Sequence, residues 1–217
     1  RYQSDCMQLK EITRKAVRLG TYVLAPLLLG GAAVAESLIT LLLTEKWLPC
    51  VPYFRIMCCL YLLQPIQTAA IQAMKAVGRS DIYLKLQVVK TSISLLIMFF
   101  CVFYYGTVMS IVVGALLTEV IVTIINFPTN MRLISYSYKE QIEDSFLLMV
   151  PGGVMALVVF LIQRLELPVI STFIIQIMVG ILFYVVISKV FRVKEFEYVW
   201  DYSVKKMRRM FVHQKKS

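Results

Sequence analysis

Several charged side chains lie inside long apolar stretches of the sequence, where a charge needs a physical reason to be present. Glu119 and Lys90 lie near the centres of two such stretches, and Glu36 and Arg55 lie closer to the ends of two others. An ionised group at the middle of a membrane costs about 2.5–3.5 kcal/mol on insertion scales. We therefore expect these groups to line a hydrated cavity in which the cations meet an anionic substrate. A Glu119–Lys90 pair sealed between two helices is the main alternative.

Uncharged polar side chains recur at helical spacing beside these charges. Gln87 shares a helix face with Lys90, Thr123 follows Glu119 by four residues, and Gln64 begins a similar stripe in another stretch. Gln64 and Gln87 are therefore candidates for substrate binding. The alternative is hydrogen bonding between helices, which is worth about 0.6–2 kcal/mol per bond in membranes.

Three basic residues lie where two apolar stretches meet. Lys75 and Arg79 are expected to anchor helix ends at the membrane surface, with their charged heads reaching toward water. Lys85 shares this expectation and is also a candidate for contact with an anionic substrate. Contact with lipid headgroups or with a pyrophosphate is the alternative role for all three.

The residue types that most catalytic and metal sites need are scarce. The five cysteines show no metal-binding spacing, and the one histidine is His213, in the last five residues. The sequence contains no nucleophile elbow, zinc-protease motif, phosphate-binding loop or pair of catalytic carboxylates. We expect no catalytic site, no metal and no cofactor.

The composition indicates a membrane protein. Of 217 residues, 59% are hydrophobic and 17% charged, and the mean hydropathy is +0.74. A soluble domain carries about 25% charged residues. Since about 20 apolar residues cross a bilayer as a helix, the sequence predicts an all-α protein with six transmembrane helices. They are Leu19–Thr44, Val51–Met74, Ile82–Tyr105, Thr107–Phe127, Phe146–Ile162 and Val169–Val190.

The basic residues fall on one side of this predicted topology. Alternate connections divide the 23 Lys and Arg residues into 20 on one side and three, namely Lys46, Arg55 and Arg164, on the other. Since positive loops remain in the cytoplasm, both ends of the chain are expected there. The net charge of +10 is thus a feature of membrane topology, and a nucleic-acid partner is not expected.

Two basic cytoplasmic segments have amphipathic patterns. Residues 1–18 are expected to extend the first span as a helix. The tail, residues 191–217, places Phe196, Trp200 and Phe211 on one stripe among basic residues, which suits a helix lying on anionic lipid. A solvated, frayed tail is the alternative. Pro26 with Gly30-Gly31, and Pro151-Gly152-Gly153, are expected either to kink their helices or to allow close helix packing.

Several motifs resemble those of bacterial polysaccharide flippases. The run Leu41–Trp47 is similar to the "LLxGEKW" end of a span in that family, with Thr44 in place of the usual glycine. The run Ala76–Asp81, followed by Leu84-Lys85, is similar to the "AxGRSDxxLK" connection, in which Gly78 ends one helix and Ser80 or Asp81 caps the next. The family is the polysaccharide transporter branch of the multidrug/oligosaccharidyl-lipid/polysaccharide exporter superfamily.

This resemblance implies a fold and a domain organisation. Members have two six-helix lobes, commonly followed by two extra helices. Residues 19–134 would then be the last four helices of the second lobe, and residues 135–190 the extra pair. We expect no signal peptide at its start, and we expect the chain to be the C-terminal part of a longer protein whose first lobe precedes it.

The resemblance also implies a function. The expected activity is alternating-access transport of an undecaprenyl-pyrophosphate-linked oligosaccharide across the bacterial inner membrane. Lys90, Arg55 and Lys85 would reduce the cost of moving the diphosphate, and Glu119 or Glu36 would bind a coupling H⁺ or Na⁺. The expected partners are the lipid-linked oligosaccharide, membrane lipids and polysaccharide assembly enzymes.

Three other classes of protein compete with this interpretation. A multidrug exporter of the same superfamily would favour an acidic cavity, whereas the cytoplasmic half here is basic. A membrane polymerase or ligase usually needs a large outer loop, and the outer connections here are short. A non-transporting assembly subunit is the third alternative.

Overall fold

The computed structural model describes residues 2–165, 167–191 and 195–197, and within them the chain is all-helical with no strand. The helices are α1 (Tyr2–Ala33), α2 (Ala35–Leu43), α3 (Val51–Tyr61), α4 (Gln64–Ala76), α5 (Ser80–Phe100), α6 (Val108–Ile134), α7 (Tyr138–Ile162) and α8 (Val169–Val190). Short 3₁₀ helices cover Glu45–Cys50 and Gln163–Leu165, and a π-helical turn covers Cys101–Tyr105.

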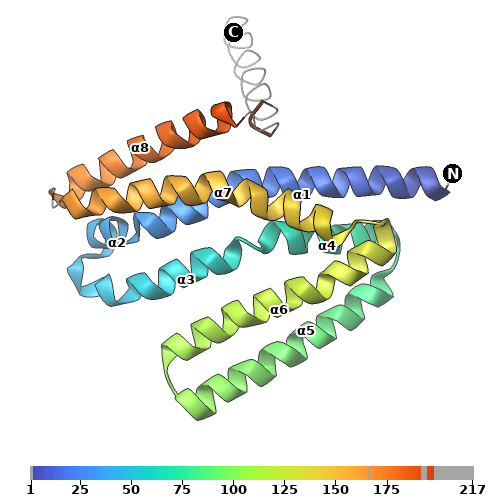
Figure 1. The fold of residues 1–217 in the computed structure, drawn as a ribbon. Helices are drawn as coiled ribbons and strands as arrows, with labels where there is room; N and C mark the ends of the chain where they lie inside the picture. The colour runs from blue at the N-terminus through green and yellow to red at the C-terminus, as the bar shows by residue number, and fades with distance from the viewer. Residues whose placement is uncertain (1, 166, 192–194, 198–217) are drawn as a thin grey trace, which may run out of the picture.

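Among the described residues, six helical segments are long and apolar enough to cross a membrane, as predicted. They are Met7–Ala33, Glu45–Ala76, Ser80–Tyr105, Val108–Ile134, Tyr138–Leu165 and Val169–Val190. The fold is thus that of a polytopic helical membrane protein. Figure 1 shows that successive segments run back and forth. The start of α1 and the α4–α5 and α6–α7 connections lie toward one end, and α2 and the α5–α6 and α7–α8 connections lie toward the other.

The bounds of the first span differ from those predicted. Residues 2–18 continue α1 as the expected helical extension, but the helix ends at Ala33, and residues 35–43 form the separate helix α2. Val34 between them has φ −88° and ψ 5°, outside helical geometry. Hydropathy could not locate this break, because both sides of Val34 are equally apolar. Gly30 and Gly31, which favour helix poorly, come just before it.

Two other connections follow from local residue chemistry. The second span is broken between α3 and α4, where Pro65 occupies the first turn of α4, the helical position that proline tolerates best. Gly78 ends α4 with φ +75°, a left-handed conformation that glycine adopts at little cost. The predicted cap of α5 was wrong, because the helix already begins at Ser80 and the capping position is Arg79, without a side-chain cap bond.

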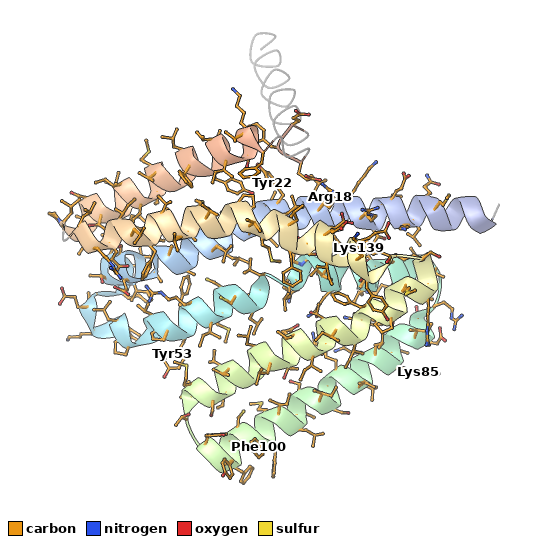
Figure 2. All side chains as sticks on the ribbon, in the orientation of Figure 1. Arg18, Tyr22, Tyr53, Lys85, Phe100 and Lys139 are labelled. Carbon is orange, nitrogen blue, oxygen red and sulfur yellow. The ribbon has the colours of Figure 1, made fainter. Side chains whose placement is uncertain are left out.

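The bundle is built around α1, which packs most extensively against α7 and also contacts α3 and α4. The α5–α6 hairpin packs against α3 and α4 mainly through α6, and α8 packs against α7 and α2. None of the side chains of α5 is buried. Figure 2 shows side chains covering the outward faces of the helices, with Phe100 at one end of α5 and Lys85 toward the other.

The proline–glycine segments serve packing in this structure. Both α1 and α7 continue through Pro26 and Pro151 without ending. A Cβ atom at Gly152 would lie 3.3 Å from the backbone carbon of Ala25 and 3.3 Å from the Leu29 side chain. Glycine at this position therefore favours the close approach of α1 and α7.

We expect Gly152→Val to destabilise the protein by about 1–3 kcal/mol, because the added carbons would meet the backbone of α1. The neighbouring Gly153→Val is the matched control, since a Cβ there meets nothing within 4 Å. Thermal unfolding of the purified variants checks this. Equal melting temperatures for the two variants would contradict the packing role of Gly152.

Candidate functional site

Three helices bring polar side chains together inside the membrane-spanning region. The Lys90 ammonium of α5 lies 3.3 Å from the Glu119 carboxylate of α6 and 3.1 Å from Oε1 of Gln67 on α4. Lys90 lies ten residues from the start of α5, which places it about 15 Å along the helix. The two residues expected to play separate roles, Lys90 toward substrate and Glu119 toward an ion, are therefore direct partners.

Gln67 is the centre of this cluster and is only 4% exposed. Its amide nitrogen donates to the Glu119 carboxylate and to the Thr123 hydroxyl, the latter at 3.1 Å. The Thr123 hydroxyl donates in turn to the backbone carbonyl of Glu119, at 2.8 Å. Such a network holds the carboxylate and the ammonium in place, because every member constrains the next. Gln67 was not among the predicted site residues.

A small polar cavity adjoins the cluster on the side of the α4–α5 connection. Its volume is about 30 Å³, enough for a water molecule. The polar side chains that line it are Tyr83, Gln87, Lys90, Gln67 and Asn126. Tyr83, Gln87 and Lys90 are spaced i, i+4 and i+7 along α5, so they form one polar stripe from the helix start to the ion pair.

The other predicted acidic residue forms a separate cluster. Arg55 donates through Nη2 to Glu36 at 2.8 Å and through Nε to the carbonyl of Ala32 at 3.2 Å. Gln163 also donates to Glu36, and the Arg55 guanidinium lies 5.3 Å from the centre of the Phe160 ring. The cluster joins the α1–α2 break to α3 and the end of α7. Arg55 is thus not brought together with Lys90.

The remaining predicted residues lie outside both clusters. Gln64 lines a groove between α1 and α4, and Gln67 is not among the residues that line it. Lys85 is exposed on α5 and is not among the lining residues of the small cavity. Arg79 pairs with Asp81 at 3.2 Å, and the Lys75 ammonium lies 5.2 Å from the Tyr83 ring centre. Both side chains are exposed near the α4–α5 connection.

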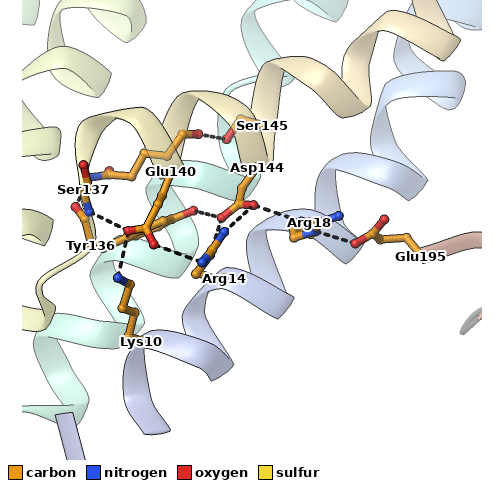
Figure 3. A network of polar contacts seen from close by, with 10 residues as sticks. Lys10, Arg14, Arg18, Tyr136, Ser137, Glu140, Asp144, Ser145 and Glu195 are labelled. Carbon is orange, nitrogen blue, oxygen red and sulfur yellow. Dashed lines mark hydrogen bonds and ion pairs between the residues drawn. The ribbon is translucent and has the colours of Figure 1, made fainter. Parts of the chain in front are cut away.

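A second ionic network, which the sequence did not predict, joins α1 to α7 (Figure 3). Its centre is Asp144, which is 2% exposed. Asp144 accepts two hydrogen bonds from Arg14, at 2.6 and 3.1 Å, one from Arg18 at 3.2 Å and one from the Tyr136 hydroxyl at 2.9 Å. A buried carboxylate with two arginines and a phenol fixes the register of these helices.

The network continues to both sides of Asp144. Glu140 pairs with Lys10 at 2.8 Å and with Arg14 at 3.1 Å, and it completes a capping box with Ser137 at the start of α7. Arg18 also pairs with Glu195. The signal in the sequence was the spacing of Lys10, Arg14 and Arg18 by four residues, which matches that of Glu140 and Asp144. The sequence does not show which helices are neighbours, so these two stripes alone could not predict an interface.

The phenol of Tyr136 remains a hydrogen-bond donor in this network. Burial, and then the neighbouring Asp144 carboxylate, raise the pKa of Tyr136 above its ordinary value. The hydroxyl is therefore protonated at neutral pH and donates to Asp144.

The fold defines the class of protein as a polytopic membrane protein, with a Lys–Glu pair and polar side chains inside its bundle. Residues 1–52 match the model of a family described as polysaccharide biosynthesis protein. The match covers α1, α2 and the Leu41–Trp47 motif, and it supports a membrane protein of polysaccharide biosynthesis. No curated protein and no solved structure matches the chain. The predicted amphipathic tail helix lies largely outside the described residues.

Proposed function

We propose that the chain belongs to a transporter that moves a pyrophosphate-linked, lipid-anchored oligosaccharide from the cytoplasmic to the outer leaflet of the bacterial inner membrane. The observation that carries this proposal is the Lys90–Glu119–Gln67 cluster, an ion pair placed between three membrane helices beside a polar cavity. The match of residues 1–52 to a polysaccharide biosynthesis family and the motif resemblance supply the substrate class.

The geometry suggests how Glu119 and an anionic substrate would compete for Lys90. In the described state, Glu119 holds the Lys90 ammonium at 3.3 Å. Protonation of Glu119 would remove that attraction and leave the ammonium available to a diphosphate. Departure of the diphosphate would restore the pair and release the proton. Protonation of Glu119 and binding of the diphosphate would thereby be linked, with Glu119 as the coupling residue and Lys90 as the substrate contact.

The outer cluster and the basic ends have supporting roles in this proposal. Glu36 and Arg55 hold the α1–α2 break against α3, so they would control access from the outer side. Lys75, Arg79 and Lys85 would anchor the cytoplasmic ends of α4 and α5 among lipid headgroups. Gln87 would line the route from that surface to Lys90, while Gln64 faces a different groove.

We further propose that these helices form the C-terminal part of a two-lobe transporter, with both ends of the chain in the cytoplasm. The exposed polar side chains of Gln87, Thr91 and Ser92 on α5 would then face helices of the first lobe. About eight further spans encoded upstream of Arg1 are expected. A start codon close to Arg1 would contradict this arrangement.

Deletion of the full-length gene tests the function. Cells without the gene are expected to accumulate lipid-linked oligosaccharide on the cytoplasmic leaflet, because assembly of the repeat unit continues while transport stops. Extraction and mass spectrometry of lipid-linked glycans measure this. Increased drug susceptibility without glycan accumulation would instead identify a multidrug exporter and overturn the proposal.

A further inference from the structure

One buried polar side chain beside the Lys90–Glu119 pair has no hydrogen-bond partner among the described residues. Asn126 of α6 is 7% exposed and lines the small cavity that Lys90 and Gln87 also line. The enclosed side-chain atoms without a partner in the described part of the chain belong to other residues, so the Asn126 amide keeps some open surface. A buried amide without a partner is costly, because it has lost its hydrogen bonds to water. The amide is therefore available to a small polar molecule in the cavity.

The Lys90 ammonium has one N–H left over. An ammonium carries three donors. Two of them meet Oε1 of Gln67 at 3.1 Å and the Glu119 carboxylate at 3.3 Å, and no third acceptor for Lys90 lies among the described residues. A donor and an amide that both lack a partner thus adjoin the same small space.

The cavity has the size and the lining of a site for a single water molecule. Its volume is about 30 Å³, whereas a bound water needs about 10–15 Å³ and two to four polar partners. Lys90 can donate to a water there, and the water can donate to the amide oxygen of Asn126. The Gln87 amide and the Tyr83 hydroxyl line the same space and can complete its hydrogen bonds.

Polar side chains lead from this cavity to the end of α5 that begins at Ser80. Tyr83, Gln87 and Lys90 share one face of the helix, and seven residues, or about 10 Å, separate the first of them from the last. The Gln87 side chain is exposed, and Tyr83 lies within the first turn of α5. A water beside Lys90 would therefore connect the ion pair to the surface at the α4–α5 connection.

We propose that one water molecule binds between Lys90 and Asn126 and delivers protons to the Lys90–Glu119 pair from the side of the α4–α5 connection. This inference rests on the role of Glu119 as coupling residue proposed above. When a proton reaches the water, Lys90 transfers one of its own protons to the Glu119 carboxylate and accepts the extra proton of the water in return. The pair ends as an ammonium and a neutral carboxylic acid, and the water is regenerated. Asn126 and Gln87 are positioning residues, because they hold the water and neither gains nor loses a proton.

Radiolytic footprinting of the protein in lipid nanodiscs tests the water itself. X-rays split bound water into hydroxyl radicals, which oxidise the nearest side chains. Met74 is 1% exposed and lines the cavity, whereas Met155 is 3% exposed and lines an apolar groove between α1, α7 and α8. We expect Met74 to be oxidised several-fold faster than Met155, and Asn126→Leu to remove the difference. Equal oxidation of the two methionines, or a difference that persists in Asn126→Leu, would overturn the proposal.

Time-resolved infrared spectroscopy after light-triggered proton release tests the delivery step. The carboxylic-acid band that Glu119→Gln removes reports protonation of Glu119. We expect Asn126→Leu to slow the appearance of this band about tenfold or more, since proton transfer needs its donor within hydrogen-bond reach or one water away. Gln87→Leu is expected to slow it several-fold. Gln72→Leu is the matched control, because Gln72 is also exposed but lines the groove between α1 and α4, and it should leave the rate unchanged.

The two proposals fail in different ways. Unchanged rates in Asn126→Leu and Gln87→Leu would overturn the water route and leave the proposed role of Glu119 intact. If Glu119→Gln removes no carboxylic-acid band, the coupling role of Glu119 is wrong, and the water route is wrong with it. Since Gln87 and Gln72 are both exposed, a failure to fold does not limit the comparison between them.

Discussion

Asp144→Ala is expected to destabilise the protein by about 3 kcal/mol, the largest stability effect of any single substitution considered for this chain. The substitution leaves Arg14, Arg18 and the Tyr136 hydroxyl without their shared acceptor. Breaking a buried ion pair from one side costs about 3–5 kcal/mol. We take the lower end because the arginine side chains are about one-third exposed and can recover some hydration.

Thermal unfolding of the purified protein measures this effect, and a fall of several degrees in Tm is expected. Glu143→Ala is the matched control on the same helix. Its side chain is 55% exposed and pairs with Lys139 at 3.8 Å, so its loss should cost at most about 0.5 kcal/mol. Asp144→Asn, which keeps an acceptor for Tyr136, should fall between the two. A Tm unchanged by Asp144→Ala would show that the network does not hold α1 to α7.

Neutralising both members of the membrane ion pair is expected to slow transport at least tenfold while largely preserving the fold. Lys90→Gln or Glu119→Gln alone leaves one charge between α4, α5 and α6 without its partner, which should cost about 2 kcal/mol of stability. The double variant has no unpaired charge and should recover most of that loss. If Lys90 binds the diphosphate and Glu119 couples the proton, the double variant should nevertheless be impaired. We expect it to transport the lipid-linked glycan at least tenfold more slowly than the unaltered protein.

The measurement is lipid-linked glycan accumulation in cells that carry each variant of the full-length gene, alongside the thermal stability of each purified protein. Lys139→Gln is the matched control, because that side chain is 84% exposed and lies outside the cluster. Normal glycan transport by the stable double variant would mean that the pair only joins the helices. The functional roles of Lys90 and Glu119 would then be wrong.

The number of spans could be predicted from the sequence because crossing a bilayer sets the length and hydropathy of a helix. The helix end at Gly78 could also be predicted, because glycine is the residue that most often takes the left-handed conformation at the end of a helix. The break at Val34 could not, because it changes the direction of the chain without changing its hydropathy.

The pairing of side chains across helices could not be predicted from a single sequence. Lys90 and Glu119 were recognisable as charges in apolar surroundings. Gln67, which hydrogen-bonds to both of them, resembled any other polar residue of a membrane helix. Asp144 lies between the predicted spans Thr107–Phe127 and Phe146–Ile162, in a polar stretch where the sequence predicts a connection. The capping box of Ser137 and Glu140 instead starts α7 at Tyr138, which places Asp144 within the helix and opposite Arg14.

We propose that the helices cross the membrane six times with their basic ends on the cytoplasmic side. Single cysteines in a cysteine-free version of the full-length protein test it most directly, through labelling with a membrane-impermeant maleimide from each side. Arg79→Cys and Lys139→Cys, at exposed positions, should react only from the cytoplasmic side, and Lys46→Cys and Arg164→Cys only from the outside. Labelling of Arg79→Cys and Lys46→Cys from the same side would contradict the six-span topology and the transport route built on it.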